Sequence, residues 1–567
     1  MILLLAASAF GVLAKAAEPG CTADAARIVY PLPQKACLGG EATLPTEISV
    51  SISSKSVGQI EDEYLSDLLK SNGIKRIDGA SAGAGTIILE DGGPKHKNFF
   101  RQEGYTLSIG GKPLTIRIAA RGSAGLYYGL VTLRQLIRKT DGGPVIYTGD
   151  IEDFPRFIFR GVLEGGYSVW GHEERLSVIK TMGALKMNSF MYAPKEGELF
   201  RRRWRVLYNE KQLDEFRQYL DACNKQHIEF SYALSPALSM EYSDPAEFDK
   251  LVAKFRQIQN LGVRRFAIFF DDVLPMLSTP SDKRHYSHIA EAEVDVTNKL
   301  LNALRERDKK AQLAFVPNQY WGWTQTRYFK ILRQQLDPDI EIGWTGKEIV
   351  SETIPSEDAQ SFIEVVGRKP AIGDNWSPFG PVTGRAPDLF NYSNSYLNNP
   401  YNYADPGRAQ RSRFVDATVA DYGWNPEAYE PQRSFKMAIN VLSGDSKYGD
   451  ILTFAMKLSG EMRYSGVKEI VCANRLSEIL EKLADADSGS EAATLEALGN
   501  TLSSYLADLS GMMAGPMEDD MKNEIKPNTD KASEKISSAL AEVKAFGAGG
   551  DKQALIQKIK GILGLKS

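Results

Sequence analysis

Short apolar runs alternate with amphipathic helical segments through the middle of the chain. Between about residues 159 and 398, each apolar run is followed by a segment whose apolar residues recur every three to four positions. Repeated β–α units of this length predict a parallel sheet closed as a (β/α)8 barrel. The predicted strands are 159–165, 187–194, 228–235, 265–272, 312–320, 340–346 and 371–376, with a less regular eighth run at 391–398.

The regions on either side of this barrel have different patterns of apolar and polar residues. Strand-like alternation, a hairpin around Gly110-Gly111 and two helical segments predict a small α/β domain over 22–150. After about residue 429 the pattern is helical throughout, which predicts an antiparallel helical bundle. The sequence thus predicts a multidomain α/β protein whose barrel covers 151–428 and whose bundle covers 429–567.

Composition and the first residues limit the class of protein and its expected location. The chain has 567 residues, 43% of them hydrophobic and 25% charged, with a net charge of -4. This balance lacks the basic excess of a nucleic-acid-binding protein. Residues 1–17 have the apolar run and the Ala14-Lys15-Ala16 site of an export signal, which predicts a secreted or periplasmic protein. The remainder has no apolar stretch long enough for an integral membrane segment.

The four cysteines and five histidines show no metal-binding spacing. CxxC and CxxH pairs are absent, so neither a zinc site nor another cofactor is expected. Export would permit a disulfide, and Cys21 with Cys37 is the only short-loop candidate. Cys223 lies in a helical pattern and is predicted to be a buried thiol. The sequence carries no signature of an oligomeric state.

Polar and aromatic residues gather where the predicted barrel strands end. Catalytic residues of this fold lie at the C-terminal ends of the strands, so these side chains are expected to share one site. Aromatic rings beside hydrogen-bonding groups suit a sugar, because rings stack on its C–H face while polar groups bind its hydroxyls. The set comprises Glu164, Lys195, Asp271, Asp272, Asn318, Tyr320, Trp344, Asp374, Asn375 and Trp376.

Asp271 and Asp272 follow an almost wholly apolar strand. Two adjacent carboxylates in a cleft repel, so one is expected to serve as the acid while the other stays charged. The alternative is a helix cap or a cation site. Most glycosidases place their two carboxylates on either side of the sugar, which neighbouring residues do not easily do. The pair fits better a reaction in which the substrate's own 2-acetamido oxygen attacks the anomeric carbon.

Two further charged strand ends allow two interpretations each. Lys195 is placed either to donate to a sugar hydroxyl or to pair with Glu196 or Glu198. Glu164 ends the first strand, and a carboxylate there more often anchors the barrel rim than binds substrate.

At these residues the chain resembles glycoside hydrolase family 84, the O-GlcNAcase-like and bacterial β-N-acetylglucosaminidases. The matching motifs run in order from about 159 to 433, and the region upstream resembles the domain that precedes the barrel in related hexosaminidases. The motifs are RGVLEGGYSVWGHEERL, FMYAPKE, GVRRFAIFFDDV, IEIGWTG, Asn399-Pro400 and DYGWNPEAYEPQRS.

The resemblance implies a role for each matching position. Asp271 orients and polarises the acetamido group, and Asp272 is the general acid and base. Tyr320 supports the acetamido oxygen while an oxazoline forms. The remaining matches contact the sugar: the backbone carbonyl of Gly165, the side chain of Lys195, and the amides of Asn375 and Asn399.

The chain also departs from the family pattern. Gly166 stands where EGFY has phenylalanine, and Gly373 stands where a tryptophan is usual. Gly380 replaces an aspartate that grips the outer sugar hydroxyls, and the YAPK motif continues into Glu196-Gly197. Trp376 is a candidate replacement for the missing tryptophan, and Trp344 a candidate wall of the pocket.

These observations predict a retaining exo-β-N-acetylglucosaminidase that works through an oxazoline intermediate. Its expected partners are N-acetylhexosamine-terminated glycans or glycoproteins. The departures leave alternatives open: a glycan-binding pseudoenzyme, or a hexosaminidase with N-acetylgalactosamine or endo (hyaluronidase-like) specificity.

Overall fold

The chain divides into two compact units, which are described separately. The computed structural model describes residues 24, 28–77, 79, 84–94, 102–166, 170–376, 380–399, 413–444, 448–460, 470–547 and 550–565. The first unit ends at Phe154, and the second contains Tyr30–Leu32 and everything from Pro155 onward. The predicted export signal (1–17) and Cys21 lie outside the described residues. Cys37 is disulfide-bonded, whereas Cys223 and Cys472 are free and buried.

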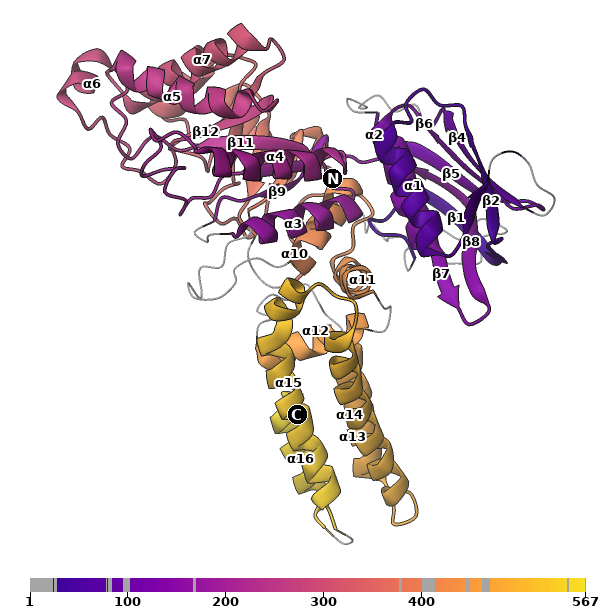
Figure 1. Ribbon diagram of the computed structural model, residues 1–567. Helices are drawn as coiled ribbons and strands as arrows, with labels where there is room; N and C mark the ends of the chain where they lie inside the picture. Colours follow the sequence, from indigo (N-terminus) through magenta and orange to yellow (C-terminus); the bar gives the residue numbers. More distant parts are fainter. Residues whose placement is uncertain are drawn as a thin grey trace, which may run out of the picture. The chain divides into compact units, whose positions relative to one another are not determined.

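The first unit is an eight-stranded mixed sheet with two helices. The strand order is β1-β8-β5-β6-β4-β2-β3, with β7 paired to β8. Figure 1 shows α1 and α2 beside this sheet, and α2 packs on β5 and β6. The elements are β1 (Lys35–Thr43), β2 (Glu47–Ile52), α1 (Gln59–Ser71), β3 (Lys75–Ile77), β4 (Gly85–Asp91), β5 (Tyr105–Gly110), β6 (Thr115–Ala120), α2 (Ser123–Leu136), β7 (Ile137–Thr140) and β8 (Gly143–Asp153).

The second unit begins with the predicted barrel. Eight parallel strands close in the order β10-β11-β12-β13-β14-β15-β16-β9, and the less regular eighth strand is among them. The strands are β9 (Phe159–Leu163), β10 (Ser189–Tyr192), β11 (Glu229–Leu234), β12 (Arg265–Phe269), β13 (Gln312–Val316), β14 (Glu341–Trp344), β15 (Pro370–Asp374) and β16 (Ser395–Asn398). All five residues of β12 are buried, as expected for a strand with helices outside and packed side chains inside.

Helices connect the barrel strands, and several begin at residues whose side chains cap the helix N-terminus. The side chains of Asn209, Asp244 and Thr279 each accept a hydrogen bond from a backbone N–H in the first turn of the helix that follows. The helices are α3 (His172–Ala184), α4 (Glu210–Asn224), α5 (Pro245–Gln259), α6 (Pro280–His285), α7 (Ile289–Arg307), α8 (Arg327–Gln335), α9 (Ser356–Val366) and α10 (Arg413–Trp424), with a 3-10 turn, η2, at Leu389–Asn391.

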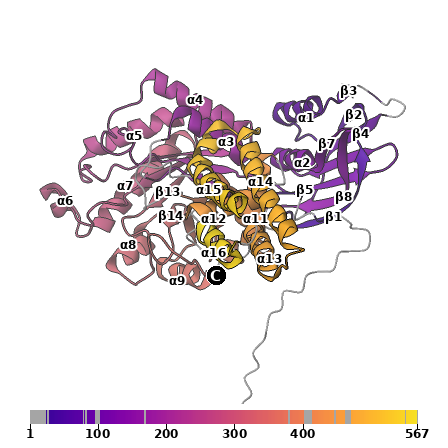
Figure 2. The same cartoon turned by 90° about the horizontal axis from the view of Figure 1, so that it is seen from below.

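The rest of the described chain is helical, as predicted. Helices α13 to α16 lie side by side in Figures 1 and 2, and their buried leucines and isoleucines form a core of their own with α12. The helices are α11 (Pro431–Ser443), α12 (Tyr448–Ser459), α13 (Val471–Asp485), α14 (Glu491–Ala514), α15 (Asp519–Ala545) and α16 (Lys552–Leu563).

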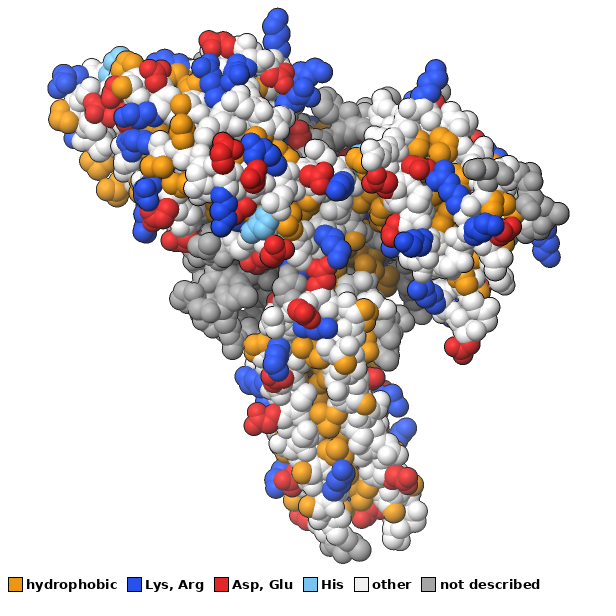
Figure 3. Space-filling view, in the orientation of Figure 1, with side chains coloured by type: hydrophobic (Ala, Val, Ile, Leu, Met, Phe, Trp, Pro, Cys, Tyr) orange, Lys and Arg blue, Asp and Glu red, His pale blue; other side chains and the backbone are white. Residues whose placement is uncertain are grey.

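The surface mixes both signs of charge. Figure 3 shows lysine and arginine side chains interspersed with aspartate and glutamate over the visible face. Among the described helices, none combines the length and the apolar character that a bilayer crossing requires.

Candidate active site

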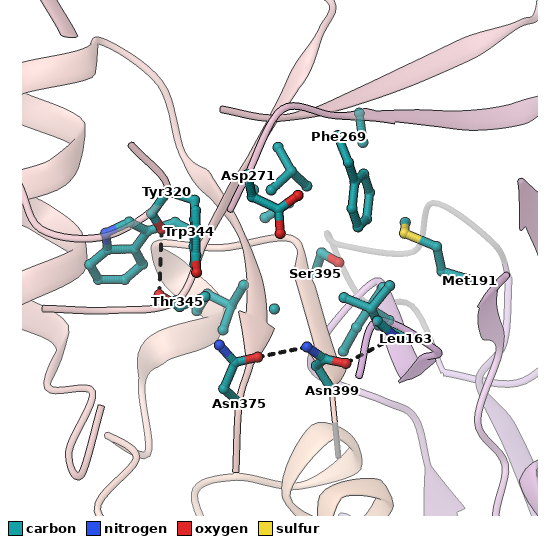
Figure 4. Close-up of a pocket in the computed structure, with 18 of the residues that line it drawn as sticks. Leu163, Met191, Phe269, Asp271, Tyr320, Trp344, Thr345, Asn375, Ser395 and Asn399 are labelled. Carbon is teal, nitrogen blue, oxygen red and sulfur yellow. Dashed lines mark hydrogen bonds between the residues drawn. The ribbon is translucent and has the colours of Figure 1, made fainter. Parts of the chain in front are cut away.

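A cavity opens at the C-terminal ends of the barrel strands and continues into the barrel interior (Figure 4). The structure brings eight of the nine predicted site residues together on its wall. They are Gly165, Lys195, Asp271, Asp272, Tyr320, Trp344, Asn375 and Asn399.

Trp376 is the exception. It does not line the cavity. Its side chain is buried in the hydrophobic core, with the guanidinium carbon of Arg385 lying 4.4 Å from the ring centre. Trp376 therefore does not take the place of the family's tryptophan. The prediction failed because neighbouring residues of a strand point to opposite sides, and Asn375 takes the inward side.

The backbone bends sharply where β12 delivers the two carboxylates. Asp271 continues the inward-facing series of β12, whose members Arg265 and Phe269 also line the cavity. The next residue would ordinarily point away, but Asp272 has a φ of 54°, in the left-handed region. That conformation costs a non-glycine residue about 1–2 kcal/mol. It turns both carboxylates toward one cavity, and such strain is concentrated at functional sites.

Lys195 holds the two carboxylates together. Its Nζ donates to Asp271 Oδ2 and to Asp272 Oδ2, each at 2.5 Å. The two oxygens therefore lie no more than about 5 Å apart. Lys195 therefore forms an ion pair, as one of its two interpretations predicted, but its partners are Asp271 and Asp272. Glu198, one of the predicted partners, lies 3.7 Å from Arg202 instead.

The two carboxylates differ in access to solvent. The Asp271 side chain is 8% exposed and that of Asp272 is 27% exposed. Asp271 Oδ1 is buried and has no hydrogen-bond partner among the described residues. A buried carboxylate oxygen left in this state costs free energy, so it is a ready acceptor for an N–H group of a ligand. The more exposed Asp272 is better placed to exchange a proton with a leaving group or with water.

Two neighbours fix Asp272 in place. The Tyr320 hydroxyl donates to Asp272 Oδ1 at 3.0 Å. Arg201 Nη2 donates to the backbone carbonyl of Asp272 at 2.7 Å. Arg201 was not among the predicted residues, because it belongs to the loop after β10 and no spacing in the sequence relates it to the end of β12.

Asn318 closes the turn from the next strand. Its Nδ2 donates to the carbonyl of Phe270 at 3.3 Å and to that of Val273 at 2.9 Å. These two carbonyls lie on either side of Asp271 and Asp272. One side chain therefore ties together both ends of the segment that carries Asp271 and Asp272, which we call the catalytic turn (Phe270–Val273).

A second set of hydrogen bonds runs across the opposite wall. The backbone N–H of Gly165 donates to Asn399 Oδ1 at 3.0 Å, and Asn399 Nδ2 donates to Asn375 Oδ1 at 2.7 Å. Asn375 Nδ2 donates in turn to the carbonyl of Ile349 at 2.6 Å. This row of hydrogen bonds fixes both amides and leaves each with further hydrogen-bonding capacity toward the cavity. A Cβ on Gly165 would lie 2.9 Å from Asn399 Oδ1, so a larger residue here would displace the Asn399 amide.

Two carboxylates at strand ends are engaged outside the cavity. Glu164 receives two hydrogen bonds from Arg175, at 2.9 and 2.7 Å, and Asp374 receives two from Arg385, at 2.7 and 2.6 Å. Both carboxylates are buried, and neither lines the cavity. The structure thus supports the rim-anchoring interpretation of Glu164.

Small residues line the cavity along β14 to β16. Barrel interiors are usually filled by branched aliphatic side chains. Here the interior positions include Gly343, Ala371, Gly373 and Ser395. A Cβ on Gly373 would meet only Leu163 Cδ2, at 3.7 Å. The cavity consequently reaches below the carboxylates, down to Arg265 and Glu341 at the other end of the strands. Over the described chain, no group of three or more histidine, cysteine, aspartate or glutamate residues is arranged to hold a metal ion.

Comparison with known proteins agrees with this arrangement. A family model described as beta-N-acetylglucosaminidase matches residues 160–456, which is more than half of the chain. A model for domain 2 of glycosyl hydrolase family 20 matches residues 26–154.

Individual relatives match the barrel region. Protein O-GlcNAcase of Rattus norvegicus is 31% identical over 274 residues, which cover 46% of this chain and 29% of that protein. The Mus musculus protein is 31% identical over 256 residues, covering 42% of this chain and 28% of that protein. The chain therefore corresponds to less than a third of the length of these curated relatives.

Solved structures match over a greater length. The structure of CpGH84B is similar with a TM-score of 0.69 and 25% identity, covering 94% of both chains. An O-GlcNAc hydrolase of Thermobaculum terrenum is similar with a TM-score of 0.55 and 26% identity, covering 72% of this chain and 88% of that one. Together with the family model, these matches establish that the chain belongs to the β-N-acetylglucosaminidase family of glycoside hydrolases, glycoside hydrolase family 84.

Proposed function

We propose that this protein releases N-acetylglucosamine from glycoconjugates by exo-acting hydrolysis with retention of configuration, using the substrate's acetamido group as the nucleophile. The observation that carries the proposal is the catalytic turn, where Asp271 and Asp272 share Lys195 and where one buried oxygen of Asp271 has no partner within the described part of the chain.

The spacing of the carboxylates argues against direct displacement by water. In inverting enzymes the two carboxyl groups are separated by roughly 6.5–9.5 Å, which leaves room for water opposite the leaving group. Here a single Lys195 Nζ lies 2.5 Å from an oxygen of each. Both carboxylates also come from one strand end, so neither is placed across the sugar as a nucleophile. A nucleophile supplied by the substrate removes this requirement.

The proposed first step divides the work between the two aspartates. The sugar binds through its hydroxyls to the amides of Asn375 and Asn399, and its acetamido N–H donates to Asp271 Oδ1. The acetamido oxygen then attacks C1 while Asp272, protonated in the bound complex, gives its proton to the glycosidic oxygen. The C1–O bond breaks, the alcohol leaves, and a positively charged oxazolinium forms beside the Asp271 carboxylate.

The second step reverses the roles of proton donor and acceptor. Asp272, now ionised, removes a proton from water, and the resulting hydroxide oxygen attacks C1 and opens the oxazoline ring. Two inversions at C1 give net retention. Tyr320, which donates to Asp272, keeps that carboxylate oriented through both steps.

A panel of aryl glycosides tests the proposal. We expect turnover of an aryl β-N-acetylglucosaminide and no turnover of the matching β-glucoside, which lacks the acetamido group. In Asp272→Asn, kcat/KM should fall by about 10²–10⁴-fold for a basic leaving group and much less for an activated one, because kcat/KM reports the first step, in which only the basic leaving group needs a proton.

The other outcomes discriminate among the alternatives. Binding of N-acetylglucosamine without turnover of any hexosaminide would indicate a pseudoenzyme. Faster turnover of the galactosaminide, or cleavage only within a polymer, would replace the proposed specificity. Equal turnover of the glucoside would contradict the mechanism.

A further inference from the structure

A buried carboxyl group lies behind the catalytic turn, outside the cavity. Glu293, in the second turn of α7, is fully buried and does not line the cavity. Its Oε2 accepts a short hydrogen bond from the hydroxyl of Tyr328, on α8, and another at 3.4 Å from the backbone N–H of Asn318. Its Oε1 is buried without a hydrogen-bond partner in the described structure. Glu293 therefore packs against the back of the site without touching the space for the sugar.

Asn318 connects this group to the catalytic turn. Its backbone N–H donates to Glu293 Oε2 at 3.4 Å and to the Tyr328 hydroxyl at 2.9 Å. Its side chain donates forward to the carbonyls of Phe270 and Val273. One residue thus joins Glu293 on one side to both ends of the catalytic turn on the other.

The surroundings favour the uncharged form of Glu293. The titratable groups that face it are Tyr328 from α8, Asp271 from the end of β12, and Tyr242 from the loop after β11. All three are acids, and none supplies a positive charge. Burial, with a smaller contribution from the Asp271 charge, raises the pKa of Glu293 to about 8. A neutral carboxyl group at this place avoids a second buried negative charge next to Asp271.

We propose that Glu293 is a positioning residue: it fixes Asn318 directly and through Tyr328, and thereby holds the turn that presents Asp271 and Asp272 to the substrate. The inference rests on the proposed function for its consequence in catalysis, but not for its structural part. This role also explains how Asp272 keeps its left-handed backbone conformation. A strained residue persists only where the surrounding contacts hold it in place.

Three substitutions test the connection. Glu293→Leu preserves volume but leaves the Tyr328 hydroxyl without its acceptor and removes one of the two acceptors of the Asn318 N–H. Asn318→Ala removes the forward bonds and leaves Glu293 intact. We expect each to lower kcat by about 100-fold with little change in KM, because displacement of catalytic groups by about 1 Å costs this much. The double variant should be no worse than either alone, since both interrupt one path.

Glu293→Gln is the conservative variant that should restore kcat, because a neutral amide oxygen still accepts both hydrogen bonds. Asp295→Asn is the matched control: Asp295 is also on α7 and also accepts from a tyrosine hydroxyl, that of Tyr286, but does not face the catalytic turn. A loss in Glu293→Gln as deep as in Glu293→Leu, or an equal loss in Asp295→Asn, would overturn the proposal.

Hydrogen exchange supplies a readout that does not depend on activity. The amides of the catalytic turn should exchange faster in Glu293→Leu and Asn318→Ala than in the wild type and Glu293→Gln. This result would support the positioning role even if the wild type cleaved no hexosaminide, in which case only the proposed function would fail. Unaltered exchange in both disruptive variants would overturn the positioning role while leaving the proposed function untouched.

Discussion

The two walls of the cavity are built in opposite ways. On the wall formed by β12 and β13, several contacts converge on one segment: Lys195 bridges the carboxylates, and Asn318 ties the ends of the catalytic turn. On the wall formed by β14 to β16, two amides lie in a single row of hydrogen bonds above positions occupied by Gly343 and Gly373.

The difference indicates what each wall must tolerate. Proton transfer depends on the placement of a few atoms, so strain and redundancy on the β12–β13 wall are compatible with its role. Sugar binding depends on hydroxyl contacts that are individually weaker, and the small side chains below them leave space. Of the departures from the family pattern, Gly373 lies on this second wall.

Among the comparisons that follow, the largest effect should come from Asp271, the carboxylate that receives no proton. Asp271→Asn should lower kcat by about 1,000-fold on an aryl N-acetylglucosaminide, because the neutral amide does not compensate the positive charge that develops on the acetamido group. Steady-state kinetics check this, with Asp308→Asn as a control whose carboxylate pairs with Arg264 away from the cavity. A loss smaller than tenfold in Asp271→Asn would erase the contrast between the two walls.

Two interior glycines offer a matched comparison of packing. A Cβ on Gly161 would lie 1.8 Å from the carbonyl oxygen of Ser189, whereas one on Gly373 meets only Leu163 at 3.7 Å. Gly161→Ala should therefore destabilise the fold by about 3 kcal/mol. Gly373→Ala should change stability by less than about 1 kcal/mol. Urea unfolding of both variants decides the point, and an equal loss would mean that the β14–β16 wall is as tightly filled as the rest.

The amide wall should affect binding more than chemistry. Asn399→Ala removes the middle of the hydrogen-bonded row from Gly165 to Asn375. We expect KM to rise about tenfold, the equivalent of one good hydrogen bond, while kcat changes little. Kinetics on the same aryl substrate give both constants. If kcat fell as far as in Asp271→Asn, the division of labour between the walls would be wrong.

The smallest predicted effect concerns stability and pH. Because the folded-state pKa of Glu293 is raised to about 8, from an ordinary value of 4.5, the folded protein keeps a proton that the unfolded chain releases between these values. Wild-type stability should thus fall as pH rises from 5 to 8, whereas Glu293→Gln lacks this contribution. As the pH rises over this range, the melting temperature of the variant should therefore increase relative to that of the wild type. The change should correspond to about 1 kcal/mol or more in the free energy of unfolding. Parallel melting curves would show that Glu293 does not hold a proton.

Much of the barrel follows from the sequence alone. All eight predicted barrel strands are confirmed, because each is a short apolar run between helical segments. The carboxylate pair could be nominated because polar residues end an apolar strand at Asp271. In the first unit, the pattern did not predict β1, β3, β7 or β8. Strands β3 and β7 are short, and glycines and polar residues interrupt the alternation of β1 and β8.

The side-chain directions and the supporting contacts were harder to predict. Glu164 and Asp374 end strands just as Asp271 does, yet they face arginines outside the cavity, since one residue of register reverses the side. Arg201 and Glu293 act through contacts between segments distant in the chain, which no local spacing records. Their roles become visible only when the loop after β10 and helix α7 are placed against the catalytic turn.

The most direct test of the central claim is the dependence of rate on the acetamido group itself. Aryl glucosaminides carrying N-acetyl, N-fluoroacetyl, N-difluoroacetyl and N-trifluoroacetyl groups differ chiefly in the nucleophilicity of the carbonyl oxygen. If that oxygen attacks C1 while Asp271 steadies the N–H, kcat/KM should fall steeply and continuously along the series. A rate that does not vary with fluorination would contradict the account, because it would assign the nucleophile to the protein or to water.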